Sequence, residues 1–314
     1  MGSPWTAVIT GGLGYTYNWA IDHLVEFKDD LYAGTFADET NGGEVWRYDG
    51  SGWTRVVNGG FGDTDNFRVF LFTVFNDTLY ASTWNQTDGG EIWYSNSGDV
   101  GTWNQANATG FGDTDNQCAT ALEAFNGYLY AGTWNSETGG EIWRTADGTT
   151  WNQVNTDGFS DYDNDAIASF AVFNGYLYAG TMHDSTGGQV WRCSTASGCD
   201  ANSDWTQVVS DGFGSTDNYG AYALIACDNY LYCVTRNDET GGEVWRSSTG
   251  DSGDWEQVGP DGFGDSNNGG PYWNNSVVAG SLHIGTWNWA NGGEVWQLAA
   301  GGGVYLPIIL KNYP

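Results

Sequence analysis

Residues 110–143 read GFGDTDNQCATALEAFNGYLYAGTWNSETGGEIW and contain almost every element of a unit that the chain repeats. A glycine-rich acidic loop leads into an apolar stretch, an Asn-Gly pair, the segment LYAGTW and a Gly-Gly-Glu-Ile-Trp ending. Asn-Gly between apolar stretches is the strongest short hairpin signal, because both residues tolerate positive φ. With the strand expected to start at Trp151, the unit predicts four short antiparallel strands.

Six copies of each element are found along the 314 residues. The opening Trp of a short strand occurs at Trp5, Trp53, Trp103, Trp151, Trp205 and Trp255. The acidic loop occurs at residues 11–18, 60–66, 110–116, 158–164, 212–218 and 262–268, and the LYAGT-like strand starts at Leu31, Leu79, Leu129, Leu177, Leu231 and Leu282. The Gly-Gly ending reaches its Trp at residues 46, 93, 143, 191, 245 and 296. Repeats of about fifty residues with four strands each are typical of propeller blades.

This pattern predicts an all-β fold, a six-bladed β-propeller that occupies residues 1–303 as one domain. Residues 5–8 form an orphan fourth strand, and the last copy lacks the corresponding Trp after Trp296. We therefore expect the N-terminal strand to complete the last blade and close the ring, which would remove two exposed sheet edges. The apolar tail, residues 304–314, is expected to be an extra strand or a packed strap.

The turns between the predicted third and fourth strands resemble a known motif. Residues 145–151 (TADGTTW) and 97–103 (SGDVGTW) resemble the Asp-box of sialidase-type propellers, each one residue short of the full motif. The period and the Gly-Gly…Trp pattern also resemble kelch repeats. Both resemblances imply a propeller architecture. Neither motif is catalytic, so neither implies an activity.

Charge and cysteine content narrow the class of partner. The net charge of −30, with 9 Lys and Arg against 39 Asp and Glu, disfavours nucleic acid and acidic membrane surfaces, because binding a polyanion needs clustered cations. This charge fits a soluble extracellular protein, a cation binder or a chain adapted to high salt. No apolar run is long enough for a membrane span. Of five cysteines, Cys193 and Cys199 are spaced to close a loop, which favours an oxidising compartment and a secreted or cell-surface protein.

Two further cysteines, Cys227 and Cys233, flank the predicted turn Asp228-Asn229. A two-residue hairpin there would place the two thiols on opposite faces, so no bridge between them is predicted. Cys118 has no evident mate.

Antiparallel connectivity places the acidic loops and the loops between the second and third strands on one face. Exposed Trp beside Asn and Asp suits sugar binding, because an indole stacks on the apolar side of a pyranose while polar groups receive its hydroxyls. Positions that differ between copies are the best candidates, because residues present in every copy are expected to be scaffold. The candidate ligand-binding residues are Trp84, Asn85, Trp134, Asn135, Trp287, Asn288, Arg236, His183, Trp19 and Tyr219. Packing of the tryptophans between blades is the alternative.

The acidic pairs of three loops have oxygen ligands at alternate positions, as in part of a calcium loop. These carboxylates are Asp63, Asp65, Asp113, Asp115, Asp161 and Asp163. Ca²⁺ is therefore a candidate ligand, with solvated loop carboxylates as the alternative. No other cofactor is predicted.

The first functional hypothesis is a non-enzymatic, lectin-like propeller that binds a glycan or a cell-surface polysaccharide. A sialidase would need an arginine triad, and the arginines outside the repeated register do not supply one convincingly. A glycan-active hydrolase or lyase with a site at the channel mouth is the second hypothesis. Asp22, Glu26 and Glu123 on inner strands could supply its carboxylates, but no catalytic residue is assigned. A structural or adhesive surface module is the third.

Overall fold

The chain folds as an all-β protein, and the only helical segments among the described residues are short 3₁₀ turns. The computed structural model describes residues 9–196, 198–271, 275–278, 281–288, 290–298 and 306–308. No helix in these ranges has the length and apolar character needed to cross a bilayer. Its contacts divide the chain into two compact units. Unit 1 comprises Met1–Ala119 with Asp147–Trp151, and unit 2 comprises Thr120–Ala146 with Asn152–Pro314.

Unit 1 contains two antiparallel groups of four strands. The first group is β1 (Asn18–Phe27), β2 (Asp30–Ala37), β3 (Val45–Tyr48) and β4 (Trp53–Val57). The second group is β5 (Arg68–Phe75), β6 (Thr78–Trp84), β7 (Ile92–Ser95) and β8 (Asn104–Gln105). Strand β9 (Cys118–Phe125) starts in unit 1 and continues in unit 2.

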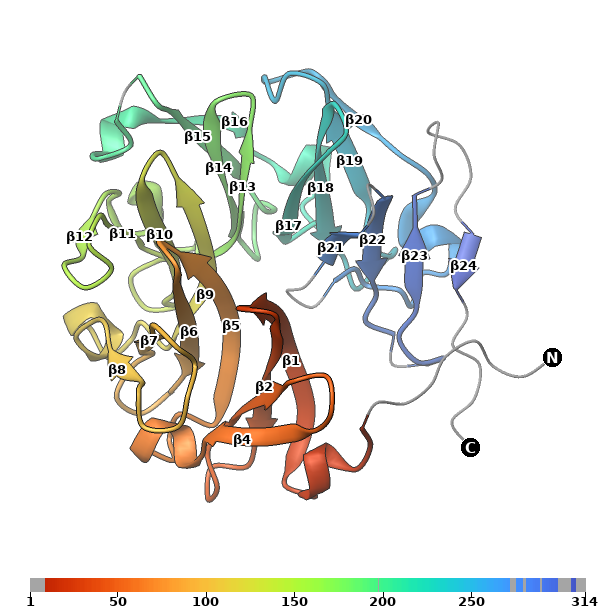
Figure 1. Ribbon diagram of the computed structural model, residues 1–314. Helices are drawn as coiled ribbons and strands as arrows, with labels where there is room; N and C mark the ends of the chain where they lie inside the picture. Colours follow the sequence, from red (N-terminus) through yellow and green to blue (C-terminus); the bar gives the residue numbers. More distant parts are fainter. Residues whose placement is uncertain are drawn as a thin grey trace. The chain divides into compact units, whose positions relative to one another are not determined.

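Unit 2 continues the same arrangement, which Figure 1 shows in green to blue for β13–β20. Strand β9 is followed by β10 (Tyr128–Trp134), β11 (Ile142–Thr145) and β12 (Asn152–Gln153). The next groups are β13 (Ala166–Phe173), β14 (Tyr176–Met182), β15 (Val190–Ser194) and β16 (Trp205–Val209), then β17 (Gly220–Cys227), β18 (Tyr230–Arg236), β19 (Val244–Ser247) and β20 (Trp255–Gln257). A separate sheet contains β21 (Asn275–Val278), β22 (Ser281–Gly285), β23 (Val295–Gln297) and β24 (Leu306–Ile308).

Each acidic loop begins with a 3₁₀ turn that carries the Gly-Phe sequence or its counterpart. These turns are η1 (Gly12–Gly14), η2 (Gly59–Gly62), η3 (Thr109–Gly112), η4 (Asp157–Ser160), η6 (Gly212–Gly214) and η7 (Asp261–Gly264), and η5 (Asn202–Asp204) precedes β16. The phenylalanine of the turn stacks on the Trp of the third strand, as in Phe159 on Trp191 with centroids 4.2 Å apart. In four of the loops the repeated Phe and Trp therefore tie the acidic loop to the third strand of the following group.

Local sequence explains the hairpins. Asn126 and Gly127 have φ of 50° and 80°, as the Asn-Gly prediction requires, and Asn174 and Gly175 have the same values. The Gly-Gly pairs serve close packing: a Cβ on Gly139 would clash with the backbone of Gly158 in the next acidic loop. Within each unit the acidic loops therefore lie beside the loops after the second strands.

The asparagine that ends each acidic loop is scaffold, as its presence in all six copies predicts. Asn66 is fully buried, and its Nδ2 donates to the Gly60 carbonyl and to Glu91 at 2.9 and 2.7 Å. Glu91 also accepts from the Trp93 indole at 2.8 Å. The same contacts recur around Asn18, Asn218 and Asn268.

Consecutive groups are joined by one residue pair at the end of each second strand. Phe36 pairs with Arg68, Trp84 with Cys118, Trp134 with Ala166, and Met182 with Gly220. The first partner of every pair is one of the positions that vary between copies. The register therefore sets each variable side chain beside the first strand of the following group.

The four-strand groups confirm a propeller-like β fold, but the sheet is not closed as predicted. The predicted closing strand, residues 5–8, lies outside the described residues. The strand that pairs with β23 is β24, in which Leu306 lies opposite Gln297. The C-terminal tail thus occupies the place that we expected the N-terminal strand to fill, because an apolar segment that follows β23 directly can pair with its free edge.

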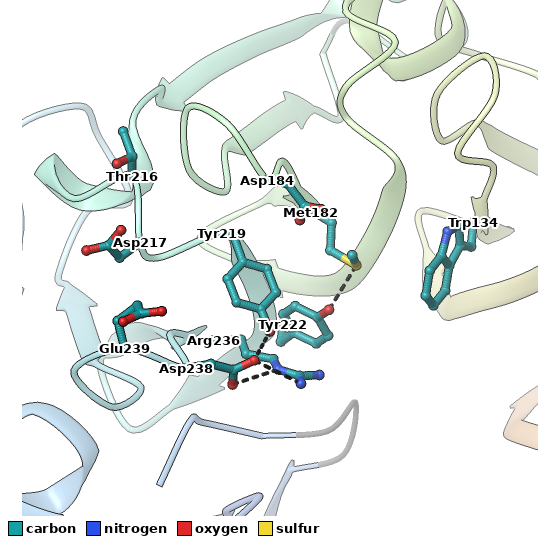
Figure 2. Close-up of a pocket in the computed structure, with 10 residues that line it drawn as sticks. All are labelled: Trp134, Met182, Asp184, Thr216, Asp217, Tyr219, Tyr222, Arg236, Asp238 and Glu239. Atoms are coloured by element: carbon teal, nitrogen blue, oxygen red, sulfur yellow. Dashed lines mark hydrogen bonds and ion pairs between the residues drawn. The ribbon is translucent and has the colours of Figure 1, made fainter. Parts of the chain in front are cut away.

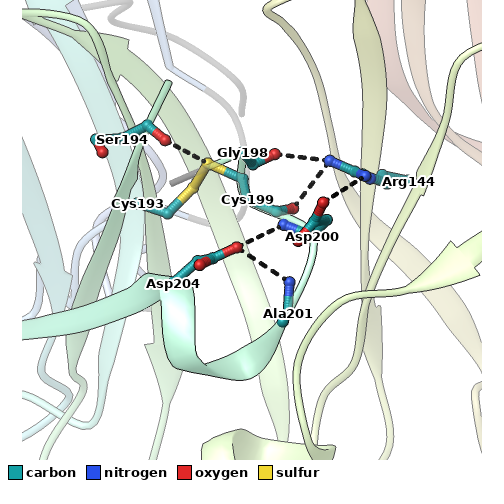
Figure 3. Close-up of a disulfide and its surroundings, with 8 residues drawn as sticks. All are labelled: Arg144, Cys193, Ser194, Gly198, Cys199, Asp200, Ala201 and Asp204. Carbon is teal, nitrogen blue, oxygen red and sulfur yellow. Dashed lines mark hydrogen bonds and ion pairs between the residues drawn. A yellow bond between two sulfur atoms is a disulfide. The ribbon is translucent and has the colours of Figure 1, made fainter. Parts of the chain in front are cut away.

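The predicted bridge between Cys193 and Cys199 is present, and Figure 3 shows its surroundings. Arg144 of β11 donates to the carbonyls of Gly198 and Cys199 at 2.7 and 3.4 Å. Asp204 accepts from the backbone N–H of Asp200 at 2.9 Å. The loop is thus attached to the preceding strand group through the repeated arginine.

The other three cysteines, Cys118, Cys227 and Cys233, are buried and form no disulfide. Cys227 lies opposite Tyr230 in the hairpin, as predicted. Cys227 forms no disulfide with Cys233, as the hairpin geometry predicts, and Cys118 forms none either.

Candidate functional site

The predicted asparagine ligands belong to the loop scaffold. Asn85 and Asn135 are fully buried, and Asn288 nearly so. The Oδ1 of Asn85 accepts from the backbone N–H groups of Thr87 and Asp88, both at 2.9 Å. Asn135 and Asn288 make the same turn. The side-chain oxygens of these amides are thus used within the loop. Their recurrence in four of the six copies was the sequence signal for this outcome.

His183 stands where four other copies have asparagine, and it makes equivalent contacts. Its Nδ1 accepts from the backbone N–H groups of Ser185 and Thr186 at 3.3 and 3.2 Å. Nδ1 must therefore be unprotonated, so Nε2 carries the proton and donates to Asp161 at 3.2 Å. Although His183, Asp161 and Asp163 bring one ligand atom each within 4.8 Å of one another, both ring nitrogens are already used.

The acidic pairs form local turns. Asp63 Oδ1 accepts from the backbone N–H of Asp65 at 3.0 Å, and Asp113 accepts in the same way from Asp115. Asp161 and Asp163 repeat this contact at 3.2 Å. An aspartate that bonds a backbone N–H two residues on stabilises a turn without any metal. Calcium binding by these six carboxylates stays a prediction.

The predicted tryptophans have four different environments. Trp84 is 6% exposed and meets Phe70 edge to face at 5.7 Å, so it is a packing residue. Trp19 is 63% exposed and lies against Phe36. Trp134 and Trp287 are half-buried and each lines a cavity. The smaller cavity, of about 210 Å³, also involves Thr286, Asn288 and Gly293.

A larger cavity, of about 500 Å³, lies within unit 2. We call it the Trp134 cavity; its lining residues are Trp134, Met182, Asp184, Thr216, Asp217, Tyr219, Tyr222, Arg236, Asp238 and Glu239. Three of these, Trp134, Tyr219 and Arg236, were predicted as ligand-binding residues. Figure 2 shows Trp134 on one side and Tyr219, Tyr222, Arg236 and Asp238 together on the other. Copy-to-copy variation thus identified residues that the fold brings together.

Burial divides the lining of the Trp134 cavity into layers. Tyr222 and Met182 are buried, and the Tyr222 hydroxyl donates to the Met182 sulfur at 2.9 Å. Trp134 and Tyr219 are half-buried. Asp184, Asp217 and Glu239 are exposed. The cavity therefore combines an apolar floor and aromatic walls with an acidic rim.

Tyr222 reaches the cavity because of a local irregularity in β17. The register between β17 and β18 shifts between Ala221 and Ala223, so Tyr222 is the extra residue of a β-bulge. Bulges re-aim side chains, and they often occur beside functional sites. Gly220 provides the room, because a Cβ on this residue would overlap the Tyr222 ring.

Arg236 is bound on several sides. Its guanidinium lies 5.5 and 5.7 Å from the ring centroids of Tyr219 and Tyr222. Its Nε and Nη2 each lie 3.3 Å from a carboxylate oxygen of Asp238, which also accepts from the Tyr219 hydroxyl at 2.8 Å. Burial alone would lower the pKa of Arg236, but its bond to Asp238 and the nearby tyrosines raise it above its usual value. Burial and the bond to Asp238 also raise the pKa of Tyr219.

Sequence reasoning missed the second residue after the variable position at the end of each second strand. This position holds Asp38, Gln86, Ser136, Asp184, Asp238 and Trp289 in the six copies. Its variation could have pointed to Asp184 and Asp238. Met182 stands at the variable position itself, so its variation could have pointed to it as well. Tyr222 reaches the cavity through the bulge in β17.

The inner-strand carboxylates considered for catalysis lie apart from the Trp134 cavity. Asp22 accepts from Nε and Nη2 of Arg68 at 2.8 Å each, so it is used in an ion pair. Burial raises the pKa of Glu123 to about 7. None of Asp22, Glu26 and Glu123 lines the Trp134 cavity.

No protein-family model and no curated protein matches this chain. A proposed 6-phosphogluconolactonase from Bacteroides uniformis is similar in structure, with a TM-score of 0.56 and 16% identity over 91% of this chain and 83% of that one. A prolyl endopeptidase gives a TM-score of 0.43 and 9% identity over 94% of this chain and 50% of its own. GH43B of a Bacteroides ovatus xyloglucan PUL gives a TM-score of 0.40 and 14% identity, over 62% of this chain and 41% of its own.

This chain therefore spans half or less of the prolyl endopeptidase and of GH43B. The likeness to the Bacteroides uniformis protein extends over most of both chains and fits a propeller-like β fold. At 16% identity this likeness concerns the fold alone.

Proposed function

We propose that this chain is a carbohydrate-binding propeller whose six strand groups are its blades, and that it holds its ligand in the Trp134 cavity. The observation that carries the proposal is the meeting of Trp134, Tyr219 and Arg236 around about 500 Å³. Cavities of this size are typical of small-molecule sites. An indole and a phenol ring offer flat apolar faces to a pyranose, and the rim offers acceptors for its hydroxyls.

The expected partner is a glycan or a polysaccharide outside the cell. The Cys193–Cys199 bridge supports this location, because disulfides persist in oxidising compartments. The name of the Bacteroides uniformis neighbour connects that protein to a sugar-derived substrate, which is consistent with the proposal without carrying it. Calcium at the acidic loops is a separate proposal, and a melting temperature unchanged between Ca²⁺ and EDTA would count against it.

Glycan-array screening followed by calorimetry tests the proposal. For the best-bound oligosaccharide, Trp134→Ala should weaken binding about tenfold or more, since truncating a central aromatic contact has effects of this size. Tyr162→Ala is the matched control, because Tyr162 is 66% exposed and does not line the cavity. The proposal fails if no glycan binds, or if Trp134→Ala and Tyr162→Ala have equal effects.

A glycan-active hydrolase is the second candidate, favoured by the four carboxylates that line the same cavity: Asp184, Asp217, Asp238 and Glu239. Glycosidases commonly use two such groups. Release of new reducing ends from the bound oligosaccharide, lost in an Asp184→Asn or Glu239→Gln variant, would identify a hydrolase. Binding without turnover supports the lectin-like function.

A further inference from the structure

We propose that the Trp134 cavity selects amino sugars, that is, pyranoses that carry a protonated amine. This inference rests on the proposed function and specifies its ligand. The cavity combines aromatic walls and an apolar floor with a rim that stays negatively charged after Arg236 has paired with Asp238. Each of these features selects one part of the ligand.

The walls and floor select a ring with an apolar side. Trp134 and Tyr219 are half-buried, while Tyr222 and Met182 beneath them are buried. A cavity of about 500 Å³ is also far larger than a single ion requires. A compact inorganic cation would leave these aromatic surfaces unused, whereas a sugar ring would cover them.

The charges select the sign of the substituent. The lining residues include one arginine and four carboxylates, which gives a net charge of −3. Arg236 already contacts Asp238 through two nitrogens and lies against two tyrosine rings. A carboxylate or phosphate on the ligand would therefore meet an arginine that is already paired with Asp238, and three further carboxylates. A protonated amine would instead meet Asp184, Asp217 and Glu239, with aromatic faces nearby that also favour cations.

The surroundings strengthen this preference. The net charge of −30 adds a long-range field that repels acidic glycans and attracts cationic ones.

Calorimetry with four probes tests the inference: a glucosamine tetrasaccharide, its fully N-acetylated counterpart, 6-phosphogluconate and spermine. The titrations are run at a mildly acidic pH, where the sugar amine is protonated and exposed carboxylates remain ionised. The glucosamine tetrasaccharide should bind about tenfold more tightly than the N-acetylated form, because acetylation removes the charge that the rim carboxylates attract. No binding of 6-phosphogluconate is expected.

Variants assign the preference to the rim. Asp217→Asn combined with Glu239→Gln should reduce the preference for the free amine to about twofold or less, while the N-acetylated form binds as before. Asp228→Asn is the matched control: it also removes a negative charge, but it lies in the exposed turn between β17 and β18 and tolerates asparagine at its φ of 53°. This control should keep the full preference.

The outcomes separate the inference from the proposed function. Equal binding of the free and N-acetylated tetrasaccharides, lost in Trp134→Ala, would overturn the amine inference and leave a sugar-binding site. Tighter binding of spermine than of glucosamine tetrasaccharide would overturn the selection of a sugar. If neither this screen nor the glycan array yields a bound sugar, both proposals fail.

Discussion

Arg68 in unit 1 and Arg236 in unit 2 each lie over aromatic rings beside an aspartate, and Arg236 lines the Trp134 cavity. The guanidinium of Arg68 is 4.6–5.1 Å from the rings of Phe36, Phe70 and Trp84. Its partner Asp22 has a side chain that is 9% exposed, against 51% for Asp238. The same chemical groups thus form a sealed cluster in one place and an open site in the other.

The difference originates in one pair of positions. Phe36 pairs with Arg68 in unit 1, and Met182 pairs with Gly220 at the equivalent place in unit 2. At the Phe36–Arg68 junction, the arginine and its aromatic neighbours fill the available space. At the second, glycine leaves room for the Tyr222 ring. At this junction the small residue of the following strand group therefore leaves room for the lining of the Trp134 cavity.

The largest effect is expected from the aspartates of the two regions. Asp22→Ala should reduce the free energy of unfolding by about 3–5 kcal/mol, because it leaves the buried Arg68 charge without its aspartate. Asp238→Ala should cost no more than about 1 kcal/mol, because that pair is open to solvent. Chemical denaturation of both variants measures the contrast. Equal losses of unfolding free energy would contradict the difference between a sealed region around Arg68 and an open one around Arg236.

A substitution at Gly220 should convert the open region toward the sealed one. Gly220→Val would displace the Tyr222 ring and overpack the site, which costs about 1–3 kcal/mol of stability. Binding of the best oligosaccharide should fall about tenfold or more while the far-UV circular dichroism stays that of a β protein. Unchanged affinity in the folded variant would show that Tyr222 does not shape the binding cavity.

Removal of the disulfide tests whether the open region is independent of its surroundings. The Cys193→Ser/Cys199→Ser double variant opens a short loop, so its free energy of unfolding should fall by about 2 kcal/mol. Sugar affinity should be unchanged, because neither cysteine lines the cavity. A parallel loss of affinity would mean that the loop supports the site.

The smallest effect concerns His23, next to Asp22 in the sealed region. Burial lowers the pKa of His23 to about 4, and its Nδ1 accepts from the backbone N–H of Phe72 at 3.3 Å. Below the ordinary histidine pKa, His23 binds a proton in the unfolded chain, whereas in the folded chain it stays neutral until the pH approaches 4. Stability should therefore fall by about 1–2 kcal/mol as the pH drops from 6.5 to 4.

His23→Gln isolates this contribution of His23, since the carboxylates titrate equally in both proteins. The difference in unfolding free energy between the two proteins should change over this pH interval. A constant difference would contradict the burial of a neutral imidazole.

Repetition made most of the fold predictable. Residues such as Asn66 and Trp93 recur in every copy, so their structural role follows from counting, and Asn126-Gly127 specifies its turn locally. The place of the tail strand β24 was not predictable. Both ends of the chain are apolar enough to pair with β23, and only the tertiary arrangement distinguishes them.

The candidate site was predictable in part. Variation between copies pointed to Trp134, Tyr219 and Arg236, but it gave equal weight to Trp84, which is buried. Sequence alone could not distinguish them, because the burial of Trp84 depends on tertiary neighbours such as Phe70 and Arg68.

The most direct test of the account is a crystal structure with the oligosaccharide that binds best. We predict one sugar ring in van der Waals contact with the Trp134 indole, with polar groups of the sugar directed to Asp184, Asp217 or Glu239. A sugar bound at the acidic loops or beside Trp19, with the Trp134 cavity empty, would contradict the account.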